Sequence, residues 1–369
     1  MIAKTKNGGV ATLADVSRTA GVSIATASTV LNRPWSSKHI TPATRERVRV
    51  AAAALRYRPN LAARALVSRR MQTVGVAAVV DGGELSHYFL EIFNGIVTAA
   101  AQRGQNTTAF TLRDWQQAAE RIRDFCDGRI DGMILLAPTF THAQVQLPAH
   151  IPFVSIHANS ALPGVVNIES DEEAGAFALT QHLIARGHWR IMHLAGPAGL
   201  IGAERRISGY KRALAAARIP LDRELLVHAG YTAALGCEAM RAWLQKHAGE
   251  PLPHAVFCAN DAVAIGCSEA LAEVGLRVPA DISVAGFDDS FAARAVVPQL
   301  TSVRQPLREM GARAVELLLA RIGRASPASA AQPKAVVFPV ELAPRASVGA
   351  APRVEQAVPA TAVAAARTP

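Results

Sequence analysis

The chain has 369 residues, half of them apolar, which is enough for a large buried core and predicts more than one domain. No apolar run approaches the roughly 20 residues that span a bilayer, and no apolar stretch follows the basic N-terminal residues. We therefore expect a cytoplasmic protein with no membrane partner rather than a membrane or secreted one. The four cysteines form no C-x-x-C pair and the histidines show no metal-ligand spacing, so we expect reduced thiols and no cofactor.

The positive charge is concentrated in the first fifth of the chain. Residues 1–70 hold 13 lysines and arginines against Asp15 and Glu46, whereas the remainder holds 26 basic and 27 acidic residues. A basic module on a near-neutral body is typical of a protein that binds a polyanion. A merely soluble basic extension is the alternative, and the apolar patterning of this module argues against it.

The basic module carries the pattern of three short helices. Residues 12–20 predict a helix that Thr12 caps and Gly21 ends. Ser23 is the natural cap of a second helix, whose inward face is formed by Ala27, Val30 and Leu31. Two short helices joined by a glycine turn predict a helix-turn-helix, and its second helix is slim enough to enter the major groove of DNA. Thr41-Pro42 caps a third helix.

A very short fourth helix is predicted next. Pro59 ends the preceding helix, and Asn60 can cap a new one of only two turns. An isolated helix that short is marginal in water, so we expect it to form only against a partner copy or DNA. We predict that residues 1–57 form the helix-turn-helix headpiece and that residues 58–72 form a hinge helix and linker.

Two motifs in this order resemble the headpiece and hinge of the LacI/GalR family of transcriptional regulators. They are Val22–Asn32 (VSIATASTVLN), and Tyr57-Arg58-Pro59-Asn60 followed by Ala63-Arg64-Ala65-Leu66. The resemblance implies DNA contacts from Thr12, Ser23, Ile24, Ala25, Thr26, Ser28, Thr29, Asn32, Asn60, Ala63 and Leu66. Leu66 matches the position where the family wedges a leucine between central base pairs, which kinks DNA.

Two departures from the family pattern leave the operator sequence open. Thr29 stands where many relatives carry arginine, and the stretch Arg33–Ala43 is longer than usual. A head with a single recognition helix needs two copies to span a typical site. We therefore expect a homodimer on a near-palindromic double-stranded DNA operator.

From Thr73 onward, short β-rich runs alternate with helical stretches. Strands are predicted at, among others, Val74–Val80, Gly132–Leu136, Val256–Ala259 and Ile282–Phe287. Such alternation predicts parallel sheets covered by helices, and a body of roughly 270 residues favours two α/β lobes over one core.

The predicted fold class is an N-terminal all-α helix-turn-helix headpiece plus an α/β two-lobed core with parallel sheets over residues 73–343. Residues 344–369 are rich in alanine, proline, valine and arginine, which predicts a disordered tail. Some relatives end in a leucine-zipper helix that makes tetramers. This tail has no heptad of leucines, which favours a dimer.

Polar residues that follow strands are the candidates for a ligand site, because ligands bind beyond the carboxyl ends of parallel strands. Asn260-Asp261 and Asp288-Asp289 are such pairs, although each taken alone is more typical of a helix cap. The body also resembles the family's periplasmic-binding-protein-like core, through Arg206–Tyr210 (RISGY), Cys258–Asp261 (CAND) and Ala285–Asp289 (AGFDD).

This second resemblance implies an effector cleft lined by Phe89, Asp171, Arg206, Tyr231, Asn260 and Asp288. Arg206 can form a two-pronged clamp, and an aromatic ring can lie against a sugar face. A polyol ligand suits this set, and so does a purine.

Together these patterns predict a sequence-specific DNA-binding transcriptional regulator, a repressor controlled allosterically by a small molecule, a sugar or sugar derivative. A sugar-binding transport receptor would need a signal peptide and no basic head. No enzyme is predicted, because the sequence shows no P-loop, no G-x-G-x-x-G, no G-x-S-x-G and no metal cluster. Repression or activation, and release or promotion of DNA binding by the effector, stay open.

Overall fold

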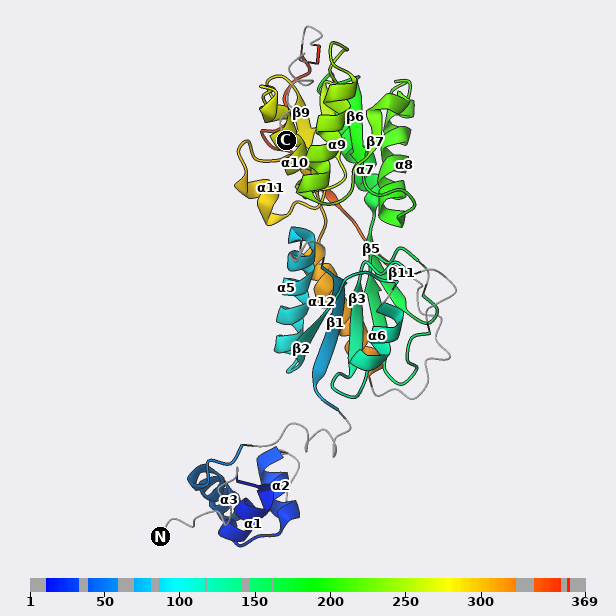
Figure 1. Ribbon diagram of the computed structural model, residues 1–369. Coiled ribbons are helices and arrows are strands. Elements are labelled where there is room, and N and C mark those ends of the chain that lie inside the picture. The colour runs from blue at the N-terminus through cyan, green and yellow to red at the C-terminus, as the bar shows by residue number, and fades with distance from the viewer. Residues whose placement is uncertain are drawn as a thin grey trace, which may run out of the picture. The chain divides into compact units, whose positions relative to one another are not determined.

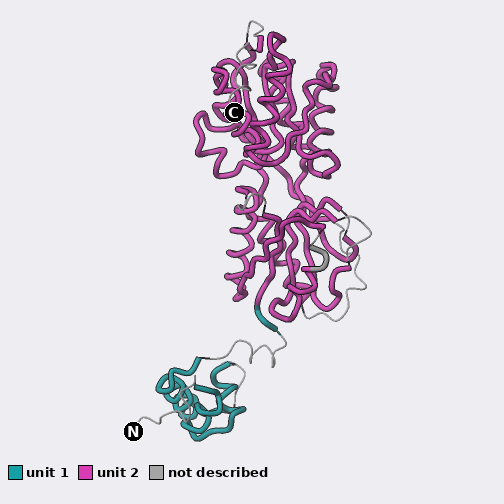
Figure 2. The backbone as a smooth tube through the Cα atoms, in the orientation of Figure 1, with its two compact units in different colours: residues 1–72 teal, residues 73–369 magenta. Residues whose placement is uncertain are grey.

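A computed structural model of the chain describes residues 11–32, 39–58, 70–80, 86–116, 118–140, 146–160, 162–322, 335–352 and 357–358. The chain divides into two compact units, Met1–Gln72 and Thr73–Pro369, shown in teal and magenta in Figure 2. Within the described ranges, no helix is both long enough and apolar enough to cross a membrane.

The first unit contains the helices α1 (Leu13–Ala20), α2 (Ile24–Asn32) and α3 (Pro42–Ala54), as Figure 1 shows. Thr12 and Asp15 form a capping box at the start of α1. The Asp15 amide donates a hydrogen bond to the Thr12 hydroxyl, and the Thr12 amide donates one to the Asp15 carboxylate. Gly21 ends α1 with a φ of 63°, which favours glycine. The core consists of small apolar side chains that let the helices cross closely: Val16, Ala20, Ala27, Val30, Val48, Ala51 and Ala52.

The second unit contains two lobes, each built on a parallel sheet (Figure 1). The first lobe has the strand order β11-β5-β4-β3-β1-β2, and the second has β7-β6-β8-β9. All neighbouring strands in both sheets run parallel. Their bounds are β1 Thr73–Val79, β2 Asn106–Leu112, β3 Gly132–Leu136, β4 Phe153–Ile156, β5 Val166–Ser170, β6 Ile191–Ala195, β7 Leu226–His228, β8 Ala255–Cys258, β9 Ser283–Ala285 and β11 Ala335–Phe338.

Helices cover both sheets, as the alternating pattern predicts. The first lobe holds α5 (His87–Gln102), α6 (Ala118–Phe125) and α12 (Leu307–Arg321). The second holds α7 (Glu172–Ala185), α8 (Ile201–Ala216), α9 (Ala233–Lys246), α10 (Asp261–Glu273), α11 (Phe291–Ala295) and the 3-10 helix η1 (Arg223–Leu225). Each lobe has buried apolar clusters of its own, so the prediction of two α/β lobes with parallel sheets is confirmed.

The chain crosses between the lobes three times. The crossings lie between β5 and α7, between β10 (Ser302–Arg304) and α12, and between β11 and β12 (Glu341–Ala343). β10 and β12 form an antiparallel pair. In the first lobe, α12 packs closely against α5 through glycines: a Cβ on Gly95 would lie 2.1 Å from the Arg308 carbonyl oxygen, and one on Gly311 2.4 Å from that of Ile92.

The C-terminal segment differs from the sequence prediction of a disordered tail after residue 343. Ser347 and Val348 are buried, and the Ser347 hydroxyl donates to the Val284 carbonyl at 2.6 Å. Val358 is also buried, and its amide donates to the Glu250 carbonyl at 2.8 Å. For residues 344–352 and 357–358 the prediction is therefore wrong. Val348 and Val358 pack into apolar clusters of the second lobe, and amino-acid composition does not predict such contacts.

Candidate functional site

The N-terminal end of α2 is the exposed end of the helix-turn-helix. Ser23 accepts the amide of Thr26 at 3.1 Å and so caps the helix. Ser23, Ile24 and Ala25 are exposed, and Ile24 keeps 54 % of its surface accessible although it is a large apolar side chain. An exposed apolar residue beside hydroxyls suits the edges of bases, which offer both methyl groups and hydrogen-bonding atoms.

The other predicted DNA contacts on α2 are partly exposed. The Thr29 hydroxyl donates to the Ala25 carbonyl at 2.8 Å, so its oxygen is left as an acceptor. The Asn32 amide donates to the Ser28 hydroxyl at 3.2 Å. Thr12, which caps α1, is exposed, and Thr26 is partly exposed. Asn60, Ala63 and Leu66 lie outside the described residues, and so does most of the predicted hinge.

Arg206 lies at the centre of the candidate cleft in the body, on α8. It is 6 % exposed, and its Nη2 donates to the carboxylate of Glu172, which is 4 % exposed, at 2.7 Å. Its Nη1 donates to the Ala259 carbonyl, and its guanidinium carbon lies 4.1 Å from the centre of the Phe287 ring. Its Nε has no hydrogen-bond partner among the described residues. Burial acts to raise the pKa of Glu172, but Arg206 and His157 bring it below its usual value.

Asp288 and Gln305 connect this centre to the first lobe. The Gln305 amide nitrogen donates to Asp288 at 2.6 Å, and the Ser170 hydroxyl, at the end of β5, donates to the Gln305 carbonyl oxygen. Burial raises the pKa of Asp288 to about 8, and the nearby Arg206 opposes this only in part. Asp288 also has a φ of 110°, which is costly for a residue with a side chain.

Tyr88 and His157 face the same centre from the first lobe. Nε2 of His157 lies 3.1 Å from the Ser170 hydroxyl oxygen and 3.2 Å from the Ser170 amide nitrogen. Nδ1 of the same ring forms a hydrogen bond with the Tyr88 hydroxyl. Burial lowers the pKa of His157, which keeps the ring neutral.

Four of the six predicted effector residues come together in the second lobe. The Arg206 guanidinium carbon lies 5.9 Å from the centre of the Tyr231 ring, and Asn260 donates to the Tyr231 carbonyl at 3.0 Å. Asn260 also caps α10 by accepting the Val263 amide at 2.8 Å. Burial raises the pKa of the Tyr231 hydroxyl; Arg206 acts to lower it, and Glu172 and Asp288 act to raise it.

The two remaining predicted residues have other positions. Phe89 lies on α5, packs on the first-lobe core and meets Tyr88 edge to face at 5.1 Å. Asp171 is exposed and caps α7 by accepting the Ala174 amide at 3.1 Å.

Sequence reasoning missed Glu172, His157 and Gln305. Glu172 belongs to an acidic run at a helix start, where acids are ordinary. Only the buried contact with Arg206 distinguishes it from Asp171 and Glu173. Gln305 follows β10, a strand of three residues that the sequence analysis did not predict, so its position after a strand was not recognised.

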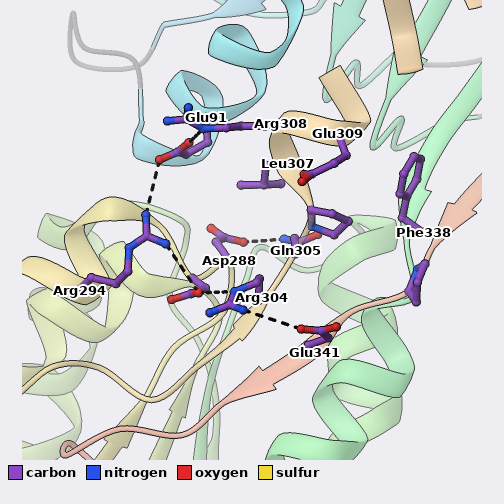
Figure 3. A pocket seen from close by; sticks show the side chains of 13 residues that line it. Glu91, Asp288, Arg294, Arg304, Gln305, Leu307, Arg308, Glu309, Phe338 and Glu341 are labelled. Carbon is purple, nitrogen blue, oxygen red and sulfur yellow. Dashed lines mark hydrogen bonds and ion pairs between the residues drawn. The ribbon is translucent and has the colours of Figure 1, made fainter. Parts of the chain in front are cut away.

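Asp288 and Gln305 also line a pocket of about 430 Å³, shown in Figure 3. Its lining contains five carboxylates and three arginines. Arg304 lies between Asp289 and Glu341, and Arg294 on α11 reaches Glu91 on α5, at 4.0 Å, across the two lobes. No group of metal ligands is present in the part of the chain that the structure describes.

Two family models match the chain. Residues 12–60 match the model described as "Bacterial regulatory proteins, lacI family", and residues 180–348 match the "Periplasmic binding protein-like domain". Each of the two units therefore matches a known family over part of its length.

Curated relatives match over most of their length. "HTH-type transcriptional regulator CelR" of Thermobifida fusca is 35% identical over 321 residues, which are 84% of this chain and 92% of the relative. "HTH-type transcriptional repressor PurR" of Vibrio atlanticus (strain LGP32) is 32% identical over 317 residues, 85% of this chain and 92% of the relative.

Solved structures agree with these relatives. The lac repressor dimer bound to operator and the anti-inducer ONPF matches with a TM-score of 0.77 and 28% identity, covering 93% of this chain and 100% of that chain. The complex of the regulator CelR with cellobiose matches with a TM-score of 0.67 and 32% identity, covering 91% of this chain and 99% of that one.

Proposed function

The chain belongs to the lacI family of bacterial regulatory proteins, and on that premise we propose that it is a repressor whose operator affinity is set by a sugar. It is a DNA-binding transcriptional regulator under small-molecule control. The observation that carries the proposal is the exposed start of α2, where Ser23, Ile24 and Ala25 project from a basic module.

The head has the properties that DNA reading requires. Most of its apolar side chains pack in a small core, whereas Ile24 and Val50 are exposed. The +11 charge of residues 1–70 attracts phosphates without regard to sequence, whereas α2 supplies the contacts to bases. We assign to base reading Ile24, Ala25 and Thr29, and to neighbouring contacts Thr12, Ser23, Thr26, Ser28 and Asn32. Asn60, Ala63 and Leu66 keep their proposed hinge role.

A sugar is the proposed effector because the cleft groups suit hydroxyls. Arg206 Nε supplies a donor, and the Tyr88 hydroxyl and the Asp288 carboxyl group supply further hydrogen-bonding groups. The rings of Tyr231 and Phe89 are available to pack against a sugar face. The relative CelR has been solved with cellobiose, which makes cellobiose the first ligand to test here.

The proposed mechanism couples the cleft to the head through lobe closure. Ser170 in the first lobe, Gln305 in the crossing and Asp288 in the second lobe form a continuous hydrogen-bonded chain. A ligand that replaces any of these bonds changes the balance between open and closed lobes. By linkage, the factor by which ligand changes DNA affinity equals the factor by which DNA changes ligand affinity.

We also propose that the protein binds its operator as a homodimer. A homodimer on a near-palindromic operator places one α2 in each half-site. We propose a cytoplasmic protein that acts as a sensor and not as an enzyme. An assay for chemical turnover of the bound effector tests that last point.

The test of function is fluorescence anisotropy on operator DNA, with the full chain and with a fragment of residues 73–369. The full chain should bind with a salt slope of about 0.9 per phosphate contacted. The fragment should lose at least about a thousandfold in affinity. Ile24→Ala in the full chain should reduce specific binding by about 1–3 kcal/mol and leave non-specific binding nearly unchanged. A fragment that binds as tightly as the full chain contradicts the proposal.

A further inference from the structure

We propose that the effector is uncharged. Glu172 makes the cleft reject phosphate and carboxylate groups, because it pairs with Arg206 and neutralises its charge. This inference rests on the proposed function and specifies the ligand class of the same site. Arg206 is the buried cation that would otherwise bind an anion, and two of its three nitrogens are already engaged. Nη2 donates to Glu172 at 2.7 Å and Nη1 donates to the Ala259 carbonyl. The charge of Arg206 is therefore already paired with a buried carboxylate, and Nε is the nitrogen without a partner among the described residues.

The position of Glu172 is built into the fold. Its carboxylate lies against Gly202 in the first turn of α8, where a Cβ would be 2.6 Å from Oε1. A side chain at position 202 would displace the Glu172 carboxylate from this place, and the partial positive charge of the helix start favours the carboxylate. Glu172 itself begins α7, so two helices of the second lobe hold the acid beside Arg206.

The charges around the cleft leave no positive excess for an anion. Glu172 balances Arg206, and the neighbouring Arg205 donates to Glu169 at 3.0 Å. Asp288 adds a buried carboxyl group that is held by the Gln305 amide. The adjoining pocket has more carboxylates than arginines in its lining. An anion that entered this site would be buried without a compensating cation, which is strongly unfavourable.

The groups that remain match hydroxyls. Arg206 Nε–H is a buried donor without a partner among the described residues, and such a donor gains a full hydrogen bond from a ligand oxygen. The Tyr88 hydroxyl, which is hydrogen-bonded to His157, and the Asp288 carboxyl group lie at the same site. A hydroxyl both donates and accepts, so an uncharged polyol matches all three groups, whereas a phosphate group brings acceptors and charge only.

The test uses the full chain and inorganic phosphate as the probe, with the melting temperature as readout at fixed pH and ionic strength. Wild type should show no saturable rise with phosphate beyond the background that the basic head gives every variant. Glu172→Gln removes the negative charge that neutralises Arg206 and should gain a saturable rise of about 2–4 °C. Glu173→Gln is the matched control, since Glu173 is the next acid, is partly exposed and pairs with Arg212 instead.

Two results would overturn the inference: a saturable phosphate effect in wild type that Arg206→Met abolishes, or a folded Glu172→Gln variant with no gain. Where Glu172→Gln does not fold, wild type alone decides, with sugars compared with their own phosphate esters. An ester that stabilises the protein more than its parent sugar contradicts an uncharged effector. No DNA is present in these assays, so their outcome is independent of whether the anisotropy experiment supports the regulator function.

Discussion

The head and the body of this protein place their functional groups in opposite environments. In the head, the proposed base-reading residues lie on the surface of α2 and the buried core contains small apolar side chains. In the body, the proposed effector groups are buried: Arg206, Glu172 and Asp288 are each at most 6 % exposed. The head is strongly basic and the body nearly neutral.

This difference shows how each region combines stability with function. A surface residue such as Ile24 contributes little to the fold, so its replacement changes recognition and leaves the head folded. A buried ion pair contributes to the fold and to binding at once, because removing one partner leaves the other charged and desolvated. Mutations in the body should therefore change stability and ligand response together.

The largest effect is expected from breaking the buried pair in the body. Arg206→Met should lower the free energy of unfolding by about 3–5 kcal/mol, because it leaves Glu172 buried without its cation. The measurement is urea unfolding followed by tryptophan fluorescence, with Arg212→Met as the matched control. Arg212 lies on the same helix, its side chain is 57% exposed and its partner Glu173 is 36% exposed, so its loss should cost about 0–1 kcal/mol. Equal losses in the two variants would mean that the Arg206 pair contributes no more than a surface ion pair.

A smaller effect is expected from the pH dependence of the body. In the folded protein the pKa of Asp288 is about 8, against 3.8 for the ordinary group. The native state therefore holds this proton more tightly than the unfolded chain does, and stability should fall as pH rises from about 4 to 8. Asp288→Asn keeps the oxygen that Gln305 donates to and removes the titration.

The stability advantage of Asp288→Asn over wild type should thus grow between pH 5 and pH 8, as measured by melting temperature. Asp127→Asn is the control, because Asp127 is exposed and its pKa is lowered by hydrogen bonds from Arg129, so it titrates below this range. An advantage that is constant over this range would show that Asp288 is already ionised at pH 5.

The smallest effect is expected in the head. Thr12→Ala removes the hydroxyl that accepts the Asp15 amide and should destabilise α1 by about 1 kcal/mol. Hydrogen exchange of the α1 amides in the full chain should then be about fivefold faster, with the body amides unchanged. Thr19→Ala, an exposed position on the same helix, is the comparison. Faster exchange throughout the body would mean that the two regions do not respond separately.

The sequence by itself determined the organisation of the molecule. Charge separation marked the head, and the periods of apolar residues gave its three helices and the alternating strands and helices of the body, because these patterns are local. The caps at Thr12 and Ser23 were also visible, since a cap depends on residues three or four positions apart.

Only the tertiary structure decided which residues of the cleft form hydrogen bonds and ion pairs with one another. Asp171 and Glu172 are adjacent acids, and the sequence could not distinguish the exposed cap from the buried partner of Arg206. His157, Ser170 and Gln305 come from three separate segments and meet only where the chain crosses between the lobes. The packing of Val348 and Val358 on the second lobe was likewise hidden. Burial and hydrogen-bond partners depend on contacts between residues far apart in the chain, and no local pattern encodes them.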